Sequence, residues 1–245
     1  MRVALFATCV NDAVYPSTAI ATVKLLERLG LDVDFPMGQT CCGQAQYNTG
    51  YRRETEPLVR RMARVFEGYD YVVTPSGSCV AMVRDNYPRI ADKNPDLAPA
   101  SRSLVPRVLE LTEFLVDVLK VTDVGAYYPH TVTYHPSCHG LRMLRLGERP
   151  RRLLEAVKGL ELVELPGAEE CCGFGGTFAV KNPDVSTAMG SDKIRNAAST
   201  GADVLCGADN SCLMHLGGML RRQDSSLRAL HIAEILASTE EEPAL

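Results

Sequence analysis

The spacing of the cysteines divides this chain into two similar halves and constrains its fold more than any other feature. In the first half, a single cysteine is followed by an adjacent pair with a glycine and then by another single cysteine: Cys9, Cys41-Cys42-Gly43 and Cys79. The second half repeats this order: Cys138, Cys171-Cys172-Gly173 and Cys212. Repetition on this scale indicates an internal duplication. We expect one repeat over residues 1–125 and another over residues 126–245.

Each half alternates short apolar runs with segments of helical periodicity. The expected strands are 3–7, 31–35, 71–74, 131–134, 160–165 and 203–205, and the expected helices are 17–29, 52–66, 151–158 and 185–198. Strands separated by helices form parallel βαβ units. The pattern predicts an α/β fold of two homologous βαβ-type repeats related by pseudo-two-fold duplication, with parallel sheets in three αβα layers. Residues 92–106, rich in Pro, Ala and Ser, are expected to be a loop, followed by a helix over 109–119.

The duplicated cysteines all follow the ends of expected strands. The carboxyl ends of parallel strands share one edge of the sheet, where ligands bind in such folds. Cysteines that are far apart in sequence are therefore expected to meet at one edge in each half.

Four thiols in each half suit either a tetrahedral zinc ion or an iron–sulfur cluster. Wide spacing and adjacent pairs differ from compact zinc knuckles, and adjacent cysteines can contact different irons of one cluster. The glycine after each pair permits a close turn that exposes amides to the sulfurs. We therefore favour iron–sulfur over zinc. Buried free cysteines are the simpler alternative, and they account best for Cys206, which has no counterpart in the first half.

The overall composition excludes several functional classes. The net charge is −4, which argues against a general nucleic-acid surface. No apolar run is long enough to span a bilayer, and the short run before Cys9 does not form an export signal. We expect a cytoplasmic protein without membrane insertion, in which clustered cysteines indicate a metal or redox site rather than disulfides.

Two histidines flank Cys138. His139 or His135 could bind a metal, donate a hydrogen bond to a cluster sulfur or carry a proton, with His139 favoured; a polar turn residue is the alternative. No catalytic residue can be assigned.

The duplicated motif resembles the cysteine-rich CCG domain found in heterodisulfide reductases and in the iron–sulfur subunit of glycolate oxidase. The chain length and the segments Gln39–Gln44, Ser76–Cys79 and Cys171–Phe178 resemble the lactate utilization protein A family more closely still. The resemblance covers nearly the whole chain. It implies a non-autonomous iron–sulfur subunit that oxidises L-lactate to pyruvate together with other subunits of a complex. It further implies up to two iron–sulfur clusters on the eight duplicated cysteines.

One position departs from the heterodisulfide reductase pattern, whose last element is Cys-x-x-Cys. Its first cysteine is replaced by Ser76 in one half and Asp209 in the other, so four cysteines remain per site. In the heterodisulfide reductase pattern five cysteines hold an unusual non-cubane cluster. The four that remain here could hold an ordinary 4Fe-4S cluster, with Asp209 or Ser76 as a weaker oxygen ligand or with no further ligand. Two other functions stay open: a zinc-stabilised scaffold subunit and a thiol–disulfide catalyst.

Overall fold

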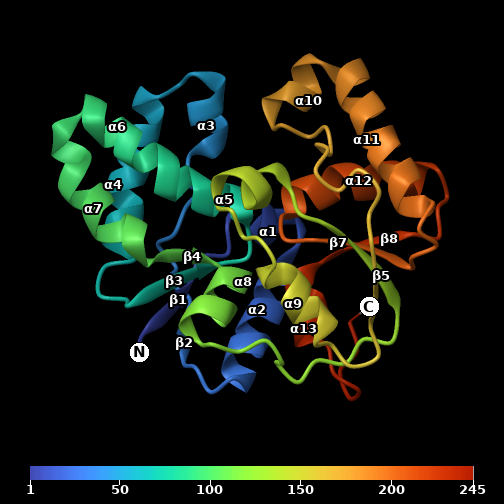
Figure 1. The fold of residues 1–245 in the computed structure, drawn as a ribbon. Coiled ribbons are helices and arrows are strands. Elements are labelled where there is room, and N and C mark those ends of the chain that lie inside the picture. Colours follow the sequence, from blue (N-terminus) through green and yellow to red (C-terminus); the bar gives the residue numbers. More distant parts are fainter. Residues whose placement is uncertain (245) are drawn as a thin grey trace. The chain divides into compact units, whose positions relative to one another are not determined.

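The chain folds into two compact units that each contain one parallel sheet (Figure 1). The computed structural model describes residues 1–244, and its units span Met1–Phe114 and the chain from Leu115 on. The strand orders are β2-β1-β3-β4 and β6-β5-β7-β8, with all neighbours parallel. The predicted α/β class and duplicated parallel sheets are therefore confirmed.

The first sheet is short and almost entirely apolar. Its strands are β1 (Val3–Leu5), β2 (Val33–Asp34), β3 (Tyr71–Thr74) and β4 (Val108–Glu110). Val3 of the central strand pairs with Val33 on one side and Tyr71 on the other. Strands covered on both faces have nearly continuous apolar sequences, as β1 does.

The helices of the first unit cover both faces of this sheet. They are α1 (Cys9–Val14), α2 (Pro16–Arg28), α3 (Gln44–Thr49), α4 (Glu56–Val65), α5 (Gly77–Ala81), α6 (Tyr87–Lys93), α7 (Ala98–Leu104) and α8 (Leu111–Glu113). The crossover from β1 to β2 runs in the opposite direction to the crossover from β2 to β3. Since such crossovers are right-handed, α2 and α4 lie on opposite faces, which gives the three-layer arrangement.

The second unit repeats this order of elements. Its strands are β5 (Thr131–His135), β6 (Glu161–Val163), β7 (Val204–Gly207) and β8 (Arg228–His231). Its helices are α9 (Arg149–Glu155), α10 (Thr177–Lys181), α11 (Pro183–Ala198), α12 (Asn210–Arg222) and α13 (Ile232–Ala237).

Two local predictions for the first half are wrong. Residues 92–106 are mainly helical, because prolines stand in the first turns of the short helix Pro95–Leu97 and of α7, where no amide hydrogen bond is lost. The buried side chains of Leu97 and Leu104 anchor this segment. The expected helix over 109–119 begins instead with residues of β4 and continues through α8 into a π-helical turn, Phe114–Val118.

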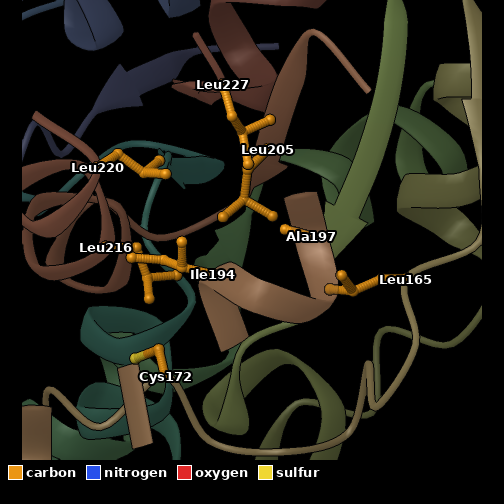
Figure 2. Packing of buried hydrophobic residues seen from close by; sticks show 8 residues of the cluster. All are labelled: Leu165, Cys172, Ile194, Ala197, Leu205, Leu216, Leu220 and Leu227. Carbon is orange, nitrogen blue, oxygen red and sulfur yellow. The ribbon is translucent and has the colours of Figure 1, made fainter. Parts of the chain in front are cut away.

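A hydrophobic cluster in the second unit includes one of the duplicated cysteines. The buried members are Leu165, Cys172, Ile194, Ala197, Leu205, Leu216, Leu220 and Leu227 (Figure 2). Phe174 and Cys212 pack against it while remaining partly exposed. The sulfurs of Cys172 and Cys212 thus lie next to apolar side chains.

Across residues 1–244, no helix combines the length and apolar character needed to cross a membrane.

Candidate metal centres

Three segments bring the cysteines of the first unit together. Cys9 begins α1 just after β1, Cys41 and Cys42 follow β2, and Cys79 lies in α5 after β3. The central strands β1 and β3 are neighbours whose crossovers leave in opposite directions, which makes the carboxyl edge between them the switch point of the sheet. Ligands bind at this position in open parallel sheets.

The four sulfurs form a continuous chain from the surface to the interior. Cys9 Sγ lies 3.6 Å from Cys41 Sγ, and Cys42 Sγ lies 3.4 Å from Cys79 Sγ. Cys41 and Cys42 also contact each other through their thiols. Cys9 is exposed, whereas Cys42 and Cys79 are buried. The expected meeting of distant thiols at one edge therefore occurs in this unit.

The glycine after each cysteine pair turns its amide toward a sulfur. The Gly43 amide donates to Cys41 Sγ at 3.4 Å, and the Gly173 amide donates to Cys171 Sγ at 3.3 Å. Both glycines have left-handed backbones, with φ of +87° and +89°. Amides directed at sulfur stabilise its negative charge, as they do around metal-bound thiolates.

The first cysteine of each adjacent pair holds the negative charge most readily. Hydrogen bonds from the Cys42 and Cys9 thiols and from the Gly43 amide lower the pKa of Cys41 to about 2. Hydrogen bonds from Cys138, Cys172 and the Gly173 amide likewise lower the pKa of Cys171 to about 2. The thiols that donate to these sulfurs have raised pKa values, so a cation bound by all four sulfurs would displace their protons.

The residues that replace the fifth cysteine are helix caps. Ser76 Oγ accepts a hydrogen bond from the Cys79 amide at 3.4 Å. The Asp209 carboxylate caps α12 by accepting from the Ser211 amide at 3.1 Å and from the Ser211 hydroxyl. Both caps fix the first turn of a helix that carries a cysteine, Cys79 or Cys212. A positioning role thus explains the departure from Cys-x-x-Cys.

The second unit builds a similar chain of thiols. Contacts link Cys138 to Cys171, Cys171 to Cys172, and Cys172 to Cys212. In addition, a ring nitrogen of His135 and the sulfurs of Cys172 and Cys212 all lie within 4.8 Å of one another. These three ligand atoms lie close enough together to hold one metal ion.

The imidazole of His135 is buried at the end of β5, with a relative exposure of 1%. Burial lowers its pKa to about 4, so the ring is neutral at physiological pH and one nitrogen has a free lone pair. Its neighbour His139, favoured from sequence, begins a π-helical turn and is not in this group. The ligand roles of His139 and Asp209 remain predictions.

The residue before the first cysteine of each site has an unfavourable backbone conformation. Thr8 has φ of 74° and Ser137 has φ of 55°. A sparsely populated backbone conformation costs a non-glycine residue about 1–3 kcal/mol. Positive φ occurs at equivalent positions of both units, and such strain concentrates at functional sites.

These donors fit a bound metal. Each unit offers four thiols, one of which has its pKa lowered by hydrogen bonds from neighbouring thiols and from a glycine amide. The second unit adds an imidazole without a hydrogen-bond partner in residues 1–244. Thiolate and imidazole are the usual ligands of zinc and of iron–sulfur clusters. By contrast, Cys206 is buried within β7, as expected for a structural thiol. Fold and site together define a duplicated α/β protein with a cysteine-rich metal-binding type of site in each half.

Comparisons with known proteins agree with this class. The model of the cysteine-rich domain family CCG matches residues 3–84 and 132–217. A lactate utilization protein A from Geobacillus sp. (strain WCH70) is 50% identical over 97% of this chain and 100% of its own length. The protein of the same name from Bacillus subtilis (strain 168) is 48% identical over the same shares. The chain belongs to the lactate utilization protein A family and carries the CCG domain twice.

One solved structure supports the fold alone. A hypothetical protein from Helicobacter pylori aligns with a TM-score of 0.59 at 13% identity, over 96% of this chain and 48% of that one.

Proposed function

We propose that the protein is an iron–sulfur subunit that transfers electrons within a complex oxidising L-lactate to pyruvate. The observation that carries this proposal is the continuous chain of four thiols in each unit, running from an exposed cysteine to a buried pair in the first. The exposed Cys9 would bring a bound group in the first unit to the surface, and in the second unit Cys172 and Cys212 lie against apolar side chains. Iron–sulfur clusters supply one-electron redox chemistry when bound.

The sulfur contacts also bear on the type of metal. Cys41 lies against Cys9 while the adjacent Cys42 lies against Cys79, so the pair faces two different partners. This arrangement suits a cluster, in which neighbouring cysteines contact different irons. We assign a 4Fe-4S cluster to each unit, held by Cys9, Cys41, Cys42 and Cys79 and by Cys138, Cys171, Cys172 and Cys212.

The lactate assignment rests on family membership. Relatives about half identical over nearly the whole chain are named for lactate utilization. Oxidation of lactate to pyruvate releases two electrons and two protons, so it needs centres that accept electrons. We place the substrate-oxidising step on partner subunits in the cytoplasm and electron transfer on this chain.

One observation favours a second candidate, a zinc-stabilised scaffold. Two thiolates on a tetrahedral zinc ion lie about 3.8 Å apart, given Zn–S bonds of about 2.3 Å. The sulfur separations of 3.4 and 3.6 Å in the first unit are close to this value. Such a scaffold would gain folding energy from the metal and carry no electrons.

Metal analysis of the full-length protein distinguishes the two candidates. Protein purified without oxygen should be brown and contain iron and acid-labile sulfide. Cys42→Ser and Cys172→Ser should each remove one cluster, whereas Cys206→Ser, a buried cysteine outside both sites, should remove none. Colourless protein with stoichiometric zinc would support the scaffold instead.

Assembly can be tested separately. Affinity capture of the tagged protein from cells grown on lactate should recover other redox subunits, and the yield should depend on intact sites. Recovery of the chain alone would argue against a role inside a complex.

A further inference from the structure

The His135 side chain is a buried polar group that the fold itself leaves unsatisfied. Its ring is 1% exposed, and neither Nδ1 nor Nε2 has a hydrogen-bond partner among residues 1–244. Burying two polar nitrogens without partners costs free energy, and such groups in native proteins usually serve a purpose.

The equivalent position in the first unit shows that the fold does not need a polar residue here. Aligning Cys9 with Cys138 places Phe6 opposite His135, and both lie at the carboxyl end of the central strand of their sheet. Phe6 is also 1% exposed and packs edge-on against Phe66, with ring centroids 5.7 Å apart. In the first unit an apolar ring therefore fills this position, and it does so by packing alone.

The surroundings of the imidazole point to a metal. One of its nitrogens lies within 4.8 Å of both Cys172 Sγ and Cys212 Sγ. Ligand atoms on one tetrahedral ion lie about 3.3–3.8 Å apart, so all three atoms lie close enough to reach one metal centre, whether a single ion or a cluster, after small side-chain movements. A neutral histidine is a good metal ligand, and no hydrogen bond among the described residues holds this one away from the sulfurs.

We propose that His135 provides an imidazole nitrogen ligand to the metal centre of the second unit, which makes that centre a mixed cysteine–histidine site while the first is held by cysteine alone. The inference rests on the proposed function in that it requires a metal at the second site. His135 would be a fifth donor beside the four cysteines of the second unit, whereas the first unit offers its four cysteines.

Pulsed electron paramagnetic resonance tests this ligation directly. The full chain carrying Cys42→Ser, which empties the first centre, is labelled with ¹⁵N-histidine and reduced. We expect a strong nitrogen coupling of the size produced by a metal-bound imidazole. The coupling should disappear in His135→Phe, which recreates the apolar ring of the first unit, and should persist in His130→Gln, a surface histidine of the same unit.

Other outcomes overturn the proposal. A spectrum without strong nitrogen coupling excludes ligation, and a weak coupling assigns the histidine to hydrogen bonding instead. Loss of the coupling in His139→Gln, but not in His135→Phe, would transfer the role to the neighbouring histidine. Because the labelled protein is measured without a change at position 135, misfolding of the histidine variant cannot hide the result.

Failure of the iron–sulfur proposal would be visible independently. Iron and sulfide analysis of the same sample decides the type of metal. If the sample contains zinc, X-ray absorption at the zinc edge replaces the resonance measurement. A nitrogen in the first coordination shell that is lost in His135→Phe supports the ligation, and an all-sulfur shell refutes it.

Discussion

Replacing the glycine that follows the second cysteine pair should remove one metal centre and leave the other. In Gly173→Ala the new Cβ would lie 2.4 Å from the Ser186 carbonyl oxygen and 3.1 Å from Met189 Cβ. The backbone oxygen belongs to α11 and cannot move without shifting that helix. The loop carrying Cys171 and Cys172 must therefore move, and the amide that donates to Cys171 Sγ moves with it.

The expected loss of stability has two parts. The left-handed backbone at φ +89° costs an alanine about 1–2 kcal/mol. The steric overlap adds about 1–3 kcal/mol, the usual range for overpacked sites. The free energy of unfolding of the second unit should thus fall by about 2–5 kcal/mol.

Two matched variants separate these parts. Gly201→Ala has φ of +72° and no contact within 4 Å among the described residues, so it should cost only the backbone term. Gly43→Ala occupies the equivalent position in the first unit, but its Cβ would meet side-chain atoms, Thr55 Cγ2 at 2.7 Å and Leu58 Cδ1 at 3.1 Å, which can shift. The loss of unfolding free energy in Gly43→Ala should lie between the losses in Gly201→Ala and Gly173→Ala.

The assay combines metal content with amide hydrogen exchange in β5 and β7, which reports the stability of the second unit by itself. Gly173→Ala should retain the metal of a single centre, and Gly201→Ala should retain both. If Gly173→Ala and Gly201→Ala had the same hydrogen exchange and the same metal content, the close approach of Ser186 would not be the reason that position 173 requires glycine.

Three further substitutions test separate features. Burial raises the pKa of Glu110 to about 7, so this carboxyl binds a proton more tightly in the folded chain than in the unfolded chain. The free energy of unfolding should therefore fall by about 3 kcal/mol as the pH rises from about 4.5 to 7. In Glu110→Gln this loss of stability with pH, followed by hydrogen exchange, should be absent. Cys206→Ala should lower stability by about 1 kcal/mol and leave the metal content unchanged, since its sulfur is buried in β7; loss of metal would make it a ligand. Asp209→Ala should cost about 1 kcal/mol through the lost cap of α12 with metal retained, whereas metal loss that Asp209→Asn also shows would identify a ligand.

The duplicated cysteines allowed much of the fold to be predicted, because each follows a strand whose apolar run is short and bounded. The strands β4 and β8 were missed for a physical reason. Glu110 and His231 each end a short strand and at once cap the next helix, Glu110 through the Thr112 amide and His231 through the Ala233 amide. With no turn residue between strand and helix, the apolar sequence resembles a single element.

The sequence identified the eight thiols and both histidines near Cys138 as candidate ligands, and the structure places His135 beside the sulfurs of Cys172 and Cys212. Proximity in sequence to Cys138 favoured His139, but β5 extends through His135 and carries that ring inward. The available signal was the repeat itself, which aligns His135 with Phe6, a polar residue opposite an apolar one. Which of two neighbouring histidines faces the sulfurs depends on where the strand ends, and sequence periodicity fixes that point poorly.

Because each unit supplies every thiol of its own site, the two proposed metal centres share no cysteine ligand, and each would be filled by itself. A preparation with too little metal is therefore a mixture of empty, half-filled and filled chains, rather than a uniform population with weakened sites. Biosynthetic delivery of the metal needs to recognise only one unit at a time, and damage to one site by oxygen leaves the other chemically intact.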